Sequence, residues 1–467
     1  MFADLRSFLD SLETRGQLKR VAKQVDWDLE IGTVMHEVHQ RRGPAVLFER
    51  VKDADFPLLC GALGSMERYA MAINAPSDPS GLQAHVLHAY QHPLPPVTVD
   101  RAPCQEHVLQ GGDIDLGRFP SPFWHPLDGG RFIGTLGVVI TEDPDTGLRN
   151  AALYREQVVG KDKTGILLGR HGSVVFQKYQ ARGKPMPVAT CFGVDQAVLA
   201  SAVMPLNYGE DELALAGALR GAPMELVQAK TVDLRVPAAA EIVFEGWISP
   251  DPGDWCEEGP FGEYTGYYGG ERAKRTTVQL SAITHRDRPI MQGTLEGPAP
   301  NESDVLVSVG VSAAFKANLI KMGVPGIKDV WFRGRSFIAV ISLERQYYSG
   351  HTRQVIDAAL ATNYGFKWII VVDADIDVFD WEQVDWALST RVQPHRDIVM
   401  ADSYHRGSSL DPSIEPALRP SVINNRSSKI GIDATTQYKG FDWPAAVRPD
   451  EAMLRQVRER WHEYGLE

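Results

Sequence analysis

The sequence predicts a multidomain α+β protein, because the pattern of apolar residues changes twice along its 467 residues. Residues 1–105 mix helical spacing with short apolar strands, residues 106–300 are rich in strand patterns, and residues 301–440 alternate strands with helices. A chain of this length is sufficient for two or three domains. We therefore expect an N-terminal α/β domain, a strand-rich central domain, a C-terminal α/β domain and a helical tail over residues 441–467.

In the N-terminal region, apolar residues recur at helical spacing over residues 3–15 and 28–41. Ala45–Phe48 and Pro57–Cys60 are short apolar runs typical of strands. The segment 91–97 contains three prolines, which disfavour both helices and strand ladders. We expect this segment to be the linker to the central region.

The central region contains a predicted hairpin. Strand patterns over Phe132–Thr141 and Leu148–Val158 flank Glu142–Gly147, a segment rich in turn-forming residues. Runs of β-branched and aromatic residues predict further strands, and a helical pattern lies between the hairpin and these strands. These two strands and the helix cover Glu241–Ile248, Thr276–His285 and Leu213–Arg220.

The C-terminal region alternates strands and helices, which predicts a layer of parallel strands covered by helices. From Asn424 onward the composition predicts a Ser/Gly/Asp/Thr loop, followed by a final helix over Asp450–Tyr464. Such a terminal helix could pack on a partner subunit or cover its own chain. The alternating elements are a strand over Phe337–Leu343, a helix over Thr352–Thr362, a strand over Trp368–Val372 and a helix over Trp381–Ser389.

Composition excludes several classes of protein. The formal charge is 48 − 60 = −12, and no basic run offsets it, so we expect no nucleic-acid partner. The most apolar windows are too short to span a bilayer, so we expect no membrane span. The four cysteines are widely spaced without a CxxC motif, which disfavours a thiolate zinc site and fits a reducing, cytoplasmic location. They are Cys60, Cys104, Cys191 and Cys256.

The segment Glu258-Gly-Pro-Phe-Gly-Glu263 places two carboxylates on a turn. Both could be solvated loop acids. Alternatively, they form an acid/base pair, because glycines let backbone approach a ligand and a neighbouring aromatic ring raises the pKa of a carboxyl group by excluding water.

Two segments of the central region could bind a nucleotide cofactor. Asn150 and Arg155 lie on the return strand of the predicted hairpin, about 16 Å apart if the strand is regular. Their odd spacing puts them on opposite faces, so both can serve one ligand only if the strand bulges or begins at Asn150. His171 lies in the glycine-rich turn Gly169–Gly172. The alternatives are an ordinary edge strand and a surface histidine.

Two polar segments follow in the C-terminal region. Asp373-Ala-Asp375-Ile-Asp377 ends an apolar strand but lacks the glycine and the final glutamate of a calcium-binding loop. A DxD motif at this place also occurs in metal-dependent glycosyltransferases, which gives an alternative function. Asn425-Arg-Ser-Ser-Lys429 offers hydroxyls, amides and a lysine that suit a phosphate, or it is a flexible loop.

Together, these segments resemble the UbiD family of decarboxylases, in the order of that family and over nearly the whole chain, to about residue 435. Each segment alone is a weak signal, whereas the set in register is specific. The segments that carry the resemblance are Phe123–Arg131, Asn150 with Arg155, His171, Glu212–Gly221, Val236–Gly246, Glu258–Glu263, Gln346–His351, Asp373–Asp377 and Ser428–Thr435.

The resemblance implies a central split β-barrel of the flavin-reductase type, an N-terminal α/β segment and a C-terminal α/β domain used for oligomerisation, as a homodimer or homohexamer. It implies prenylated FMN, supplied by a flavin prenyltransferase, with a divalent metal (Mn²⁺ or Mg²⁺) on its phosphate and K⁺ close by. The implied substrate is an aromatic, heteroaromatic or α,β-unsaturated carboxylic acid, which reacts reversibly with loss of carbon dioxide.

The resemblance also implies site residues. Arg155, Glu258 and Glu263 correspond to the catalytic Glu–Arg–Glu set, in which Arg155 holds the substrate carboxylate and Glu263 donates the proton that replaces carbon dioxide. Backbone carbonyls near Ser201–Met204 are expected to hold K⁺. A non-catalytic flavoprotein or assembly subunit of the same fold is the other alternative, although such subunits usually lose part of the catalytic set. The implied metal ligands are Asn150, His171 and Glu212, and the implied cofactor contacts add Leu153, Tyr154, Arg155, Arg170 and Lys429.

Overall fold

The computed structural model describes residues 2–333, 337–362, 364–419 and 425–466. Its N-terminal part is a four-stranded sheet in the order β1-β2-β3-β20, with β20 supplied from far along the chain. Helix α1 buries Leu5, Phe8 and Leu12 beneath this part. The helices and strands predicted for residues 3–60 are confirmed within two residues at each end. The elements are α1 (Leu5–Thr14), β1 (Leu18–Val21), α2 (Glu30–Gln40), β2 (Ala45–Phe48), β3 (Leu58–Cys60), α3 (Met66–Ala72), α4 (Pro79–Gln91) and β20 (Met291–Gln292).

The segment 91–97, expected to be a linker, lies between a helix and a strand. Helix α4 ends at Gln91, and the chain enters β4 (Val97–Thr98), which pairs in parallel with β12 (Glu225–Gln228). A third strand, β13 (Arg235–Pro237), completes this small sheet.

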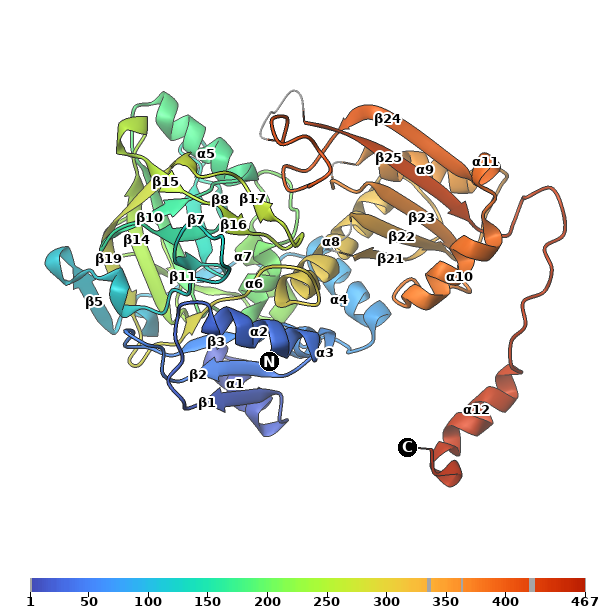
Figure 1. The fold of residues 1–467 in the computed structure, drawn as a ribbon, viewed down its shortest axis with the longest axis horizontal. Coiled ribbons are helices and arrows are strands. Elements are labelled where there is room, and N and C mark those ends of the chain that lie inside the picture. The colour runs from blue at the N-terminus through green and yellow to red at the C-terminus, as the bar shows by residue number, and fades with distance from the viewer. Residues whose placement is uncertain (1, 334–336, 363, 420–424, 467) are drawn as a thin grey trace.

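The central part is a curled, nine-stranded half-barrel sheet (Figure 1). Its path runs β6-β9-β10-β19-β14-β11-β7-β8, and β5 pairs with β19. The predicted hairpin is confirmed, with Val138 opposite Leu153 and Glu142 opposite Arg149. However, each predicted long strand is two shorter ones, because β6 and β9 pair with each other apart from β7 and β8. The strands are β5 (His107–Gln110), β6 (Phe132–Gly134), β7 (Val138–Glu142), β8 (Arg149–Leu153), β9 (Glu156–Val158), β10 (Lys163–Ile166), β11 (Met186–Phe192), β14 (Ile242–Ile248) and β19 (Thr277–His285).

Helices α5, α6 and α7 and the hairpins β15–β18 and β16–β17 lie around the half-barrel (Figure 1). Helix α5 follows β10, and α6 and α7 pack on each other next to β8. Helix α7 confirms the helix predicted over Leu213–Arg220. The elements are α5 (Arg170–Ala181), α6 (Gln196–Ala202), α7 (Glu212–Arg220), β15 (Cys256–Glu258) paired with β18 (Ala273–Arg275), and β16 (Phe261–Gly262) paired with β17 (Tyr268–Gly269).

The C-terminal part is a five-stranded sheet in the order β21-β22-β23-β25-β24. Strands β22, β23 and β25 are parallel, as the alternating pattern predicts, and the two edge strands are antiparallel. The elements are α8 (Glu302–Lys321), β21 (Ile327–Arg333), β22 (Ile338–Leu343), α9 (His351–Ala361), β23 (Trp368–Asp373), α10 (Trp381–Arg391), α11 (Pro394–Asp397), β24 (Ile398–Arg406), β25 (Arg426–Ala434) and α12 (Glu451–Glu459).

The loop predicted from Asn424 onward is wrong over Arg426–Ala434, which forms β25; Asn424 itself lies outside the described residues. This strand is rich in serine, glycine and lysine, but burial alternates along its first residues, with Ser427 and Lys429 inside. Pairing with β23 and β24 on both sides therefore outweighs the loop-like composition.

Helix α8 is the one helix of the described ranges that is long and apolar enough to cross a membrane. However, 61% of its most apolar window is buried inside the protein, where it packs against α4 and β21. It is therefore the core helix that joins the central and C-terminal parts. By contrast, α12 buries none of its residues and lies away from the body at the end of an extended segment (Figure 1), so it does not cover its own chain.

Candidate active site

Arg155 lies between two glutamates that are more than a hundred residues further along the chain. Its guanidinium group donates two hydrogen bonds to Glu258, Nε to Oε1 at 2.8 Å and Nη2 to Oε2 at 3.1 Å. Nη1 donates to Oε1 of Glu263 at 2.5 Å. The exposed fractions of the three side chains are 7%, 0% and 13%, respectively. One cation is therefore held between two carboxylates, in a place nearly free of water.

The local backbone explains how this trio forms. Strand β8 ends at Leu153 and β9 begins at Glu156, so Arg155 lies in the break between them. The segment Glu258–Glu263 belongs to the hairpins β15–β18 and β16–β17 and is not an exposed loop. Gly269 must be glycine, because a Cβ there would lie 2.4 Å from Cγ of Glu263. The carbonyl of Gly269 accepts a further hydrogen bond from Arg155 Nη1 at 3.2 Å.

Burial controls the proton affinity of Glu263. Removal from water raises the pKa of its carboxyl group, although the Arg155 guanidinium opposes this shift. The neighbouring carboxylates raise the pKa of Arg155 against its burial, so the guanidinium stays charged. The site therefore combines a fixed cation with a carboxyl group that retains its proton at higher pH than an exposed glutamate.

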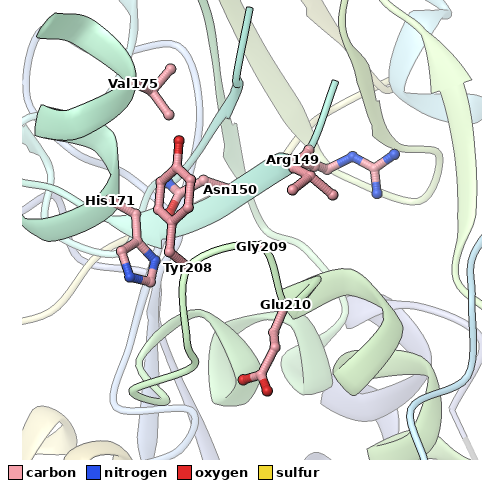
Figure 2. Close-up of a pocket in the computed structure, with 8 residues that line it drawn as sticks. Arg149, Asn150, His171, Val175, Tyr208, Gly209 and Glu210 are labelled. Carbon is pink, nitrogen blue, oxygen red and sulfur yellow. The ribbon is translucent and has the colours of Figure 1, made fainter. Parts of the chain in front are cut away.

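The three expected metal ligands come from three different elements. Asn150 is the second residue of β8, His171 lies in the first turn of α5, and Glu212 begins α7. Asn150 and His171 line one small pocket together with Tyr208 and Glu210 (Figure 2). Oε2 of Glu212 accepts a hydrogen bond at 3.0 Å from the amide of Ala151, the residue after Asn150.

Tyr154 joins β8 to the start of α5. Its hydroxyl group donates to the carbonyl of Gly169 at 3.0 Å and accepts from the amide of Gly172 at 3.0 Å. The amide nitrogen of Asn150 also donates to this hydroxyl at 3.5 Å, which leaves the amide oxygen of Asn150 as the atom for a ligand. After the end of β8 at Leu153, the side chain of Tyr154 therefore lies beside the expected metal ligand Asn150, and that of Arg155 lies between Glu258 and Glu263. Asn150 is the second residue of β8 and the strand ends before Arg155, so the alternation of faces along one regular strand does not apply to this pair.

The residues present fit a divalent cation bound to a phosphate. Burial raises the pKa of Glu212 to about 7, while burial and Arg170 lower that of His171 and so favour the neutral imidazole that binds metals. Within the described ranges, no three His, Cys, Asp or Glu side chains form a complete metal site. An amide oxygen, an imidazole and one carboxylate are an incomplete set for Mn²⁺ or Mg²⁺, which phosphate oxygens can complete.

Several expected contacts are not brought to this pocket. Lys429 lies in β25, where its ammonium group donates to the carbonyls of Leu360 and Thr362, each at 3.4 Å. In the part of the chain that the structure describes, no hydrogen bond or ion pair links Lys429 to Asn150, His171 or Glu212. The flexible loop that the composition of this segment allows is wrong, because the segment is a central strand, whereas the contact of Lys429 with a phosphate stays a prediction.

The expected K⁺ carbonyls lie where α6 ends. The carbonyl of Ser201 accepts from the amide of Met204 at 3.0 Å, and that of Met204 accepts from Leu206 at 2.9 Å. The carbonyl of Ser201 also accepts from the amide of Val203, whereas the carbonyl oxygen of Met204 retains one further lone pair.

The structure gives the acids after β23 a structural role. Arg391 donates to Asp373 at 3.3 Å and to Asp375 at 2.8 and 3.0 Å, and the hydroxyl and amide of Thr436 also donate to Asp373. Arg448 pairs with Asp375 as well. These carboxylates are neutralised by arginines, so they do not form the metal site that a glycosyltransferase needs.

Sequence reasoning missed three groups around the site. Tyr208, four residues before Glu212, packs against His171. Asp128 accepts hydrogen bonds from the amides of His125 and Gly262 and so holds the segment that carries Glu263. Among the residues that the structure describes, none makes a hydrogen bond to the buried Oε2 of Glu296, and burial raises the pKa of this carboxyl group to about 8. Tyr208 had a sequence signal in its closeness to Glu212, and Asp128 had one in its place within the Phe123–Arg131 segment of the resemblance, whereas Glu296 had none.

Three family models match the chain in succession. They describe the N-terminal, Rift-related and C-terminal domains of 3-octaprenyl-4-hydroxybenzoate carboxy-lyase, and they match residues 9–83, 96–299 and 307–434. Together they cover most of the chain.

Solved structures agree over nearly the full length. The UbiD-class enzyme HmfF from Pelotomaculum thermopropionicum, in complex with FMN, is 36% identical, with 97% of this chain and 99% of that chain covered and a TM-score of 0.85. Vanillic acid decarboxylase from Sedimentibacter hydroxybenzoicus, in closed form, is 31% identical, with both chains fully covered and a TM-score of 0.87. The 3,4-dihydroxybenzoic acid decarboxylase AroY from Klebsiella pneumoniae is 30% identical, with 99% of each chain covered and a TM-score of 0.84. The chain belongs to the UbiD family of carboxy-lyases and is a UbiD-type decarboxylase.

Proposed function

We propose that this decarboxylase acts on an aromatic, heteroaromatic or α,β-unsaturated carboxylic acid through Arg155, Glu258 and Glu263, with prenylated FMN bound beside Asn150, His171 and Glu212. The observation that carries the proposal is the buried guanidinium between two carboxylates, with N–O distances of 2.5–3.1 Å. Arg155 and the proposed metal ligand Asn150 lie five residues apart in the same short segment of chain. The catalytic residues and the metal ligands can therefore contact one bound cofactor and its substrate.

Arg155 binds the carboxylate of the substrate. A guanidinium group presents a planar fork of donors that matches a carboxylate, and Glu258 fixes the orientation of this fork from the opposite side through two hydrogen bonds. Glu258 is fully buried, and the two hydrogen bonds from Arg155 give each of its carboxyl oxygens a donor there.

Glu263 donates the proton that replaces carbon dioxide. Its raised pKa keeps the acid form available, and its hydrogen bond to Arg155 puts that proton beside the carboxylate-binding group. After each turnover Glu263 regains a proton, and its 13% exposure gives it the contact with solvent that this step needs.

The cofactor, when bound, supplies the electron sink that no side chain provides for loss of carbon dioxide from an sp² carbon. Asn150, His171 and Glu212 would hold Mn²⁺ or Mg²⁺ against its phosphate, with Leu153, Tyr154, Arg170 and Lys429 as further cofactor contacts. We assign K⁺ to carbonyls near Ser201–Met204. The half-barrel sheet supports a split barrel of the flavin-reductase type as the cofactor-binding unit.

The proposal extends to organisation and partners. We divide the chain into domains over residues 1–105, 106–300 and 301–440, with a tail over 441–467. The solved relatives include a dimeric form of HmfF, which supports a homodimer or homohexamer here. A flavin prenyltransferase would supply the cofactor, and the absence of disulfides among the four cysteines supports a cytoplasmic enzyme.

Mass spectrometry of the released cofactor, combined with turnover, tests the proposal. Protein co-expressed with a flavin prenyltransferase is expected to carry a flavin heavier than FMN by a prenyl-derived addition. It is also expected to exchange labelled bicarbonate into at least one acid of a panel of aromatic, heteroaromatic and acrylic acids. A prenylated cofactor without exchange into any acid of the panel would favour a non-catalytic flavoprotein, and unmodified FMN alone in this co-expressed protein would contradict the cofactor assignment.

A further inference from the structure

Three segments carry the proposed metal ligands, and one group of side chains ties these same three segments together. This group, which we name the clasp, consists of Asp143, Lys178 and Tyr208. Asp143 follows β7 in the hairpin whose other strand carries Asn150. Lys178 is on α5, seven residues or about two turns after His171, and Tyr208 is in the loop that leads to Glu212.

Asp143 is the centre of the clasp. It is 1% exposed, and its Oδ2 accepts from Nζ of Lys178 at 2.5 Å and from the hydroxyl group of Tyr208. Its Oδ1 accepts from the amide of Asp145 at 2.8 Å. These donors lower the pKa of Asp143 to about 2, against the effect of burial, so it is an ionised acceptor throughout the neutral range.

Tyr208 is the residue of the clasp that lies in a loop, between α6 and α7. Its hydroxyl group is anchored on Asp143, the edge of its ring meets the ring of His171 at 5.3 Å and 88°, and Nζ of Lys178 lies 5.3 Å from its centroid. The side chain lines the pocket with Asn150 and His171 (Figure 2), yet the residue is 41% exposed. The following residue, Gly209, has a φ of +94°, so the loop turns there in a conformation that favours glycine.

We propose that the clasp closes the loop of residues 203–211 over the metal–phosphate pocket and sets how fast a metal-bound phosphate ligand leaves it. The proposal rests on the function proposed above. Tyr208 and Asp143 are positioning residues: they act by holding His171 and the segment of Glu212 in register with Asn150. Opening the loop breaks a hydrogen bond to a buried, ionised acceptor. Loss of one such bond corresponds to a roughly 10- to 100-fold change in rate.

The test uses FMN and MnCl₂ with the purified, cofactor-free full chain. The dissociation rate of FMN is followed by stopped-flow flavin fluorescence, with Mn²⁺ and with EDTA. Tyr208→Phe keeps the ring against His171 and removes only the anchor on Asp143. It is expected to release FMN about 10- to 100-fold faster than wild type in Mn²⁺ and at a nearly unchanged rate in EDTA. Tyr438→Phe is the matched control, because Tyr438 is exposed and lies beyond β25, and it is expected to match wild type.

The contrast between Mn²⁺ and EDTA separates positioning from general destabilisation, which would speed release in both solutions. Asp143→Asn is a second variant, expected to act in the same direction, and its thermal unfolding is measured alongside. If wild type shows Mn²⁺-dependent retention of FMN and Tyr208→Phe retains it equally well, the clasp is overturned while the proposed function stands. If wild type shows no Mn²⁺-dependent retention, the proposed metal site fails and the clasp fails with it.

Discussion

Arg155 and Glu258 form a two-point ion pair, with N–O distances of 2.8 and 3.1 Å, in which both side chains are almost completely buried. The two residues are 103 positions apart in sequence, so the pair also joins the β8–β9 segment to the β15–β18 hairpin. A buried pair of this kind is costly to desolvate, and removal of one partner leaves the other charge uncompensated. The pair is therefore both a structural tie and the part of the site that fixes the guanidinium.

Arg155→Lys is expected to lower the catalytic efficiency of decarboxylation. Lysine keeps the charge but donates from a single point, so it cannot make the two-point contact with Glu258 and also reach Glu263. We expect kcat/KM to fall about 100-fold or more, since small misplacements of a binding group have effects of this size. Steady-state kinetics check this, with Arg288→Lys as the control because Arg288 is a highly exposed arginine. Wild-type kinetics in Arg155→Lys would show that the two-point geometry is not needed.

Glu263→Gln is expected to abolish proton donation while leaving the fold and the cofactor site intact. Glutamine is of the same size and can still contact Arg155 through its amide oxygen, but it has no acid proton. We expect turnover to fall by about 10²–10⁴-fold, the usual contribution of a general acid. The flavin absorbance of the purified variant is expected to match wild type. Glu257→Gln, at an exposed neighbouring position, is the control. Retained turnover would remove Glu263 from its role.

The pH dependence of decarboxylation follows from the raised pKa of Glu263. A proton donor must be protonated to act, so kcat/KM is expected to be high at low pH and to fall as pH rises through the pKa of this group. Because burial raises that pKa, the midpoint of the fall lies above the ordinary value of 4.5. A pH–rate profile over the range in which the protein stays folded checks this. A rate that rises through the same region would instead assign Glu263 as a base.

Much of the fold follows from local patterns, because the periodicity of apolar residues is set within each element. The β7–β8 hairpin and the parallel strands β22 and β23 are predicted correctly for this reason. Strand β25 is not, since its serines, glycine and lysine become strand-like only when β23 and β24 pair with it. Whether a segment forms a central strand depends on the strands that pair with it as much as on its own propensity.

The site depends even more on contacts between distant segments. From the residues alone, Glu258 and Glu263 are as compatible with solvated loop acids as with an acid pair, and only the family resemblance identifies Arg155 as their partner. The reason is physical: burial and the approach of a guanidinium group, not the local sequence, determine the state of these carboxyl groups. Tyr208 and Glu296 were missed because neither forms a motif with its sequence neighbours.

Glu212→Gln is expected to weaken Mn²⁺ binding without unfolding the protein. Glutamine keeps an oxygen that can accept from the amide of Ala151, but it removes the negative charge that a divalent cation needs. We expect the affinity for Mn²⁺ in the presence of FMN to fall at least 10- to 100-fold, roughly the loss seen when even an outer-shell partner is removed. Isothermal titration calorimetry measures it, and Glu225→Gln, at the exposed first position of β12, is the control. Unchanged affinity would exclude Glu212 as a ligand.

Stability is expected to depend on pH through Glu296, whose pKa burial raises from 4.5 to about 8. Below pH 4.5 the carboxyl group is protonated in both the folded and the unfolded chain, so it imposes no penalty. Between pH 4.5 and 8 only the unfolded chain releases the proton, so the free energy of unfolding falls as pH rises through this window and the penalty is complete above it. Glu296→Gln has no proton to lose and is expected to be more stable than wild type at pH 8 by about 4 kcal/mol.

Chemical denaturation of wild type and Glu296→Gln at pH 5 and pH 8 measures this difference. The amide keeps an acceptor for Ser303, whose hydroxyl donates to Oε1 of Glu296 at 2.5 Å, so the substitution preserves the one hydrogen bond of this carboxyl group. The two proteins are expected to differ little at pH 5 and strongly at pH 8. An equal difference at both pH values would mean that packing, and not the buried proton, controls stability at this position.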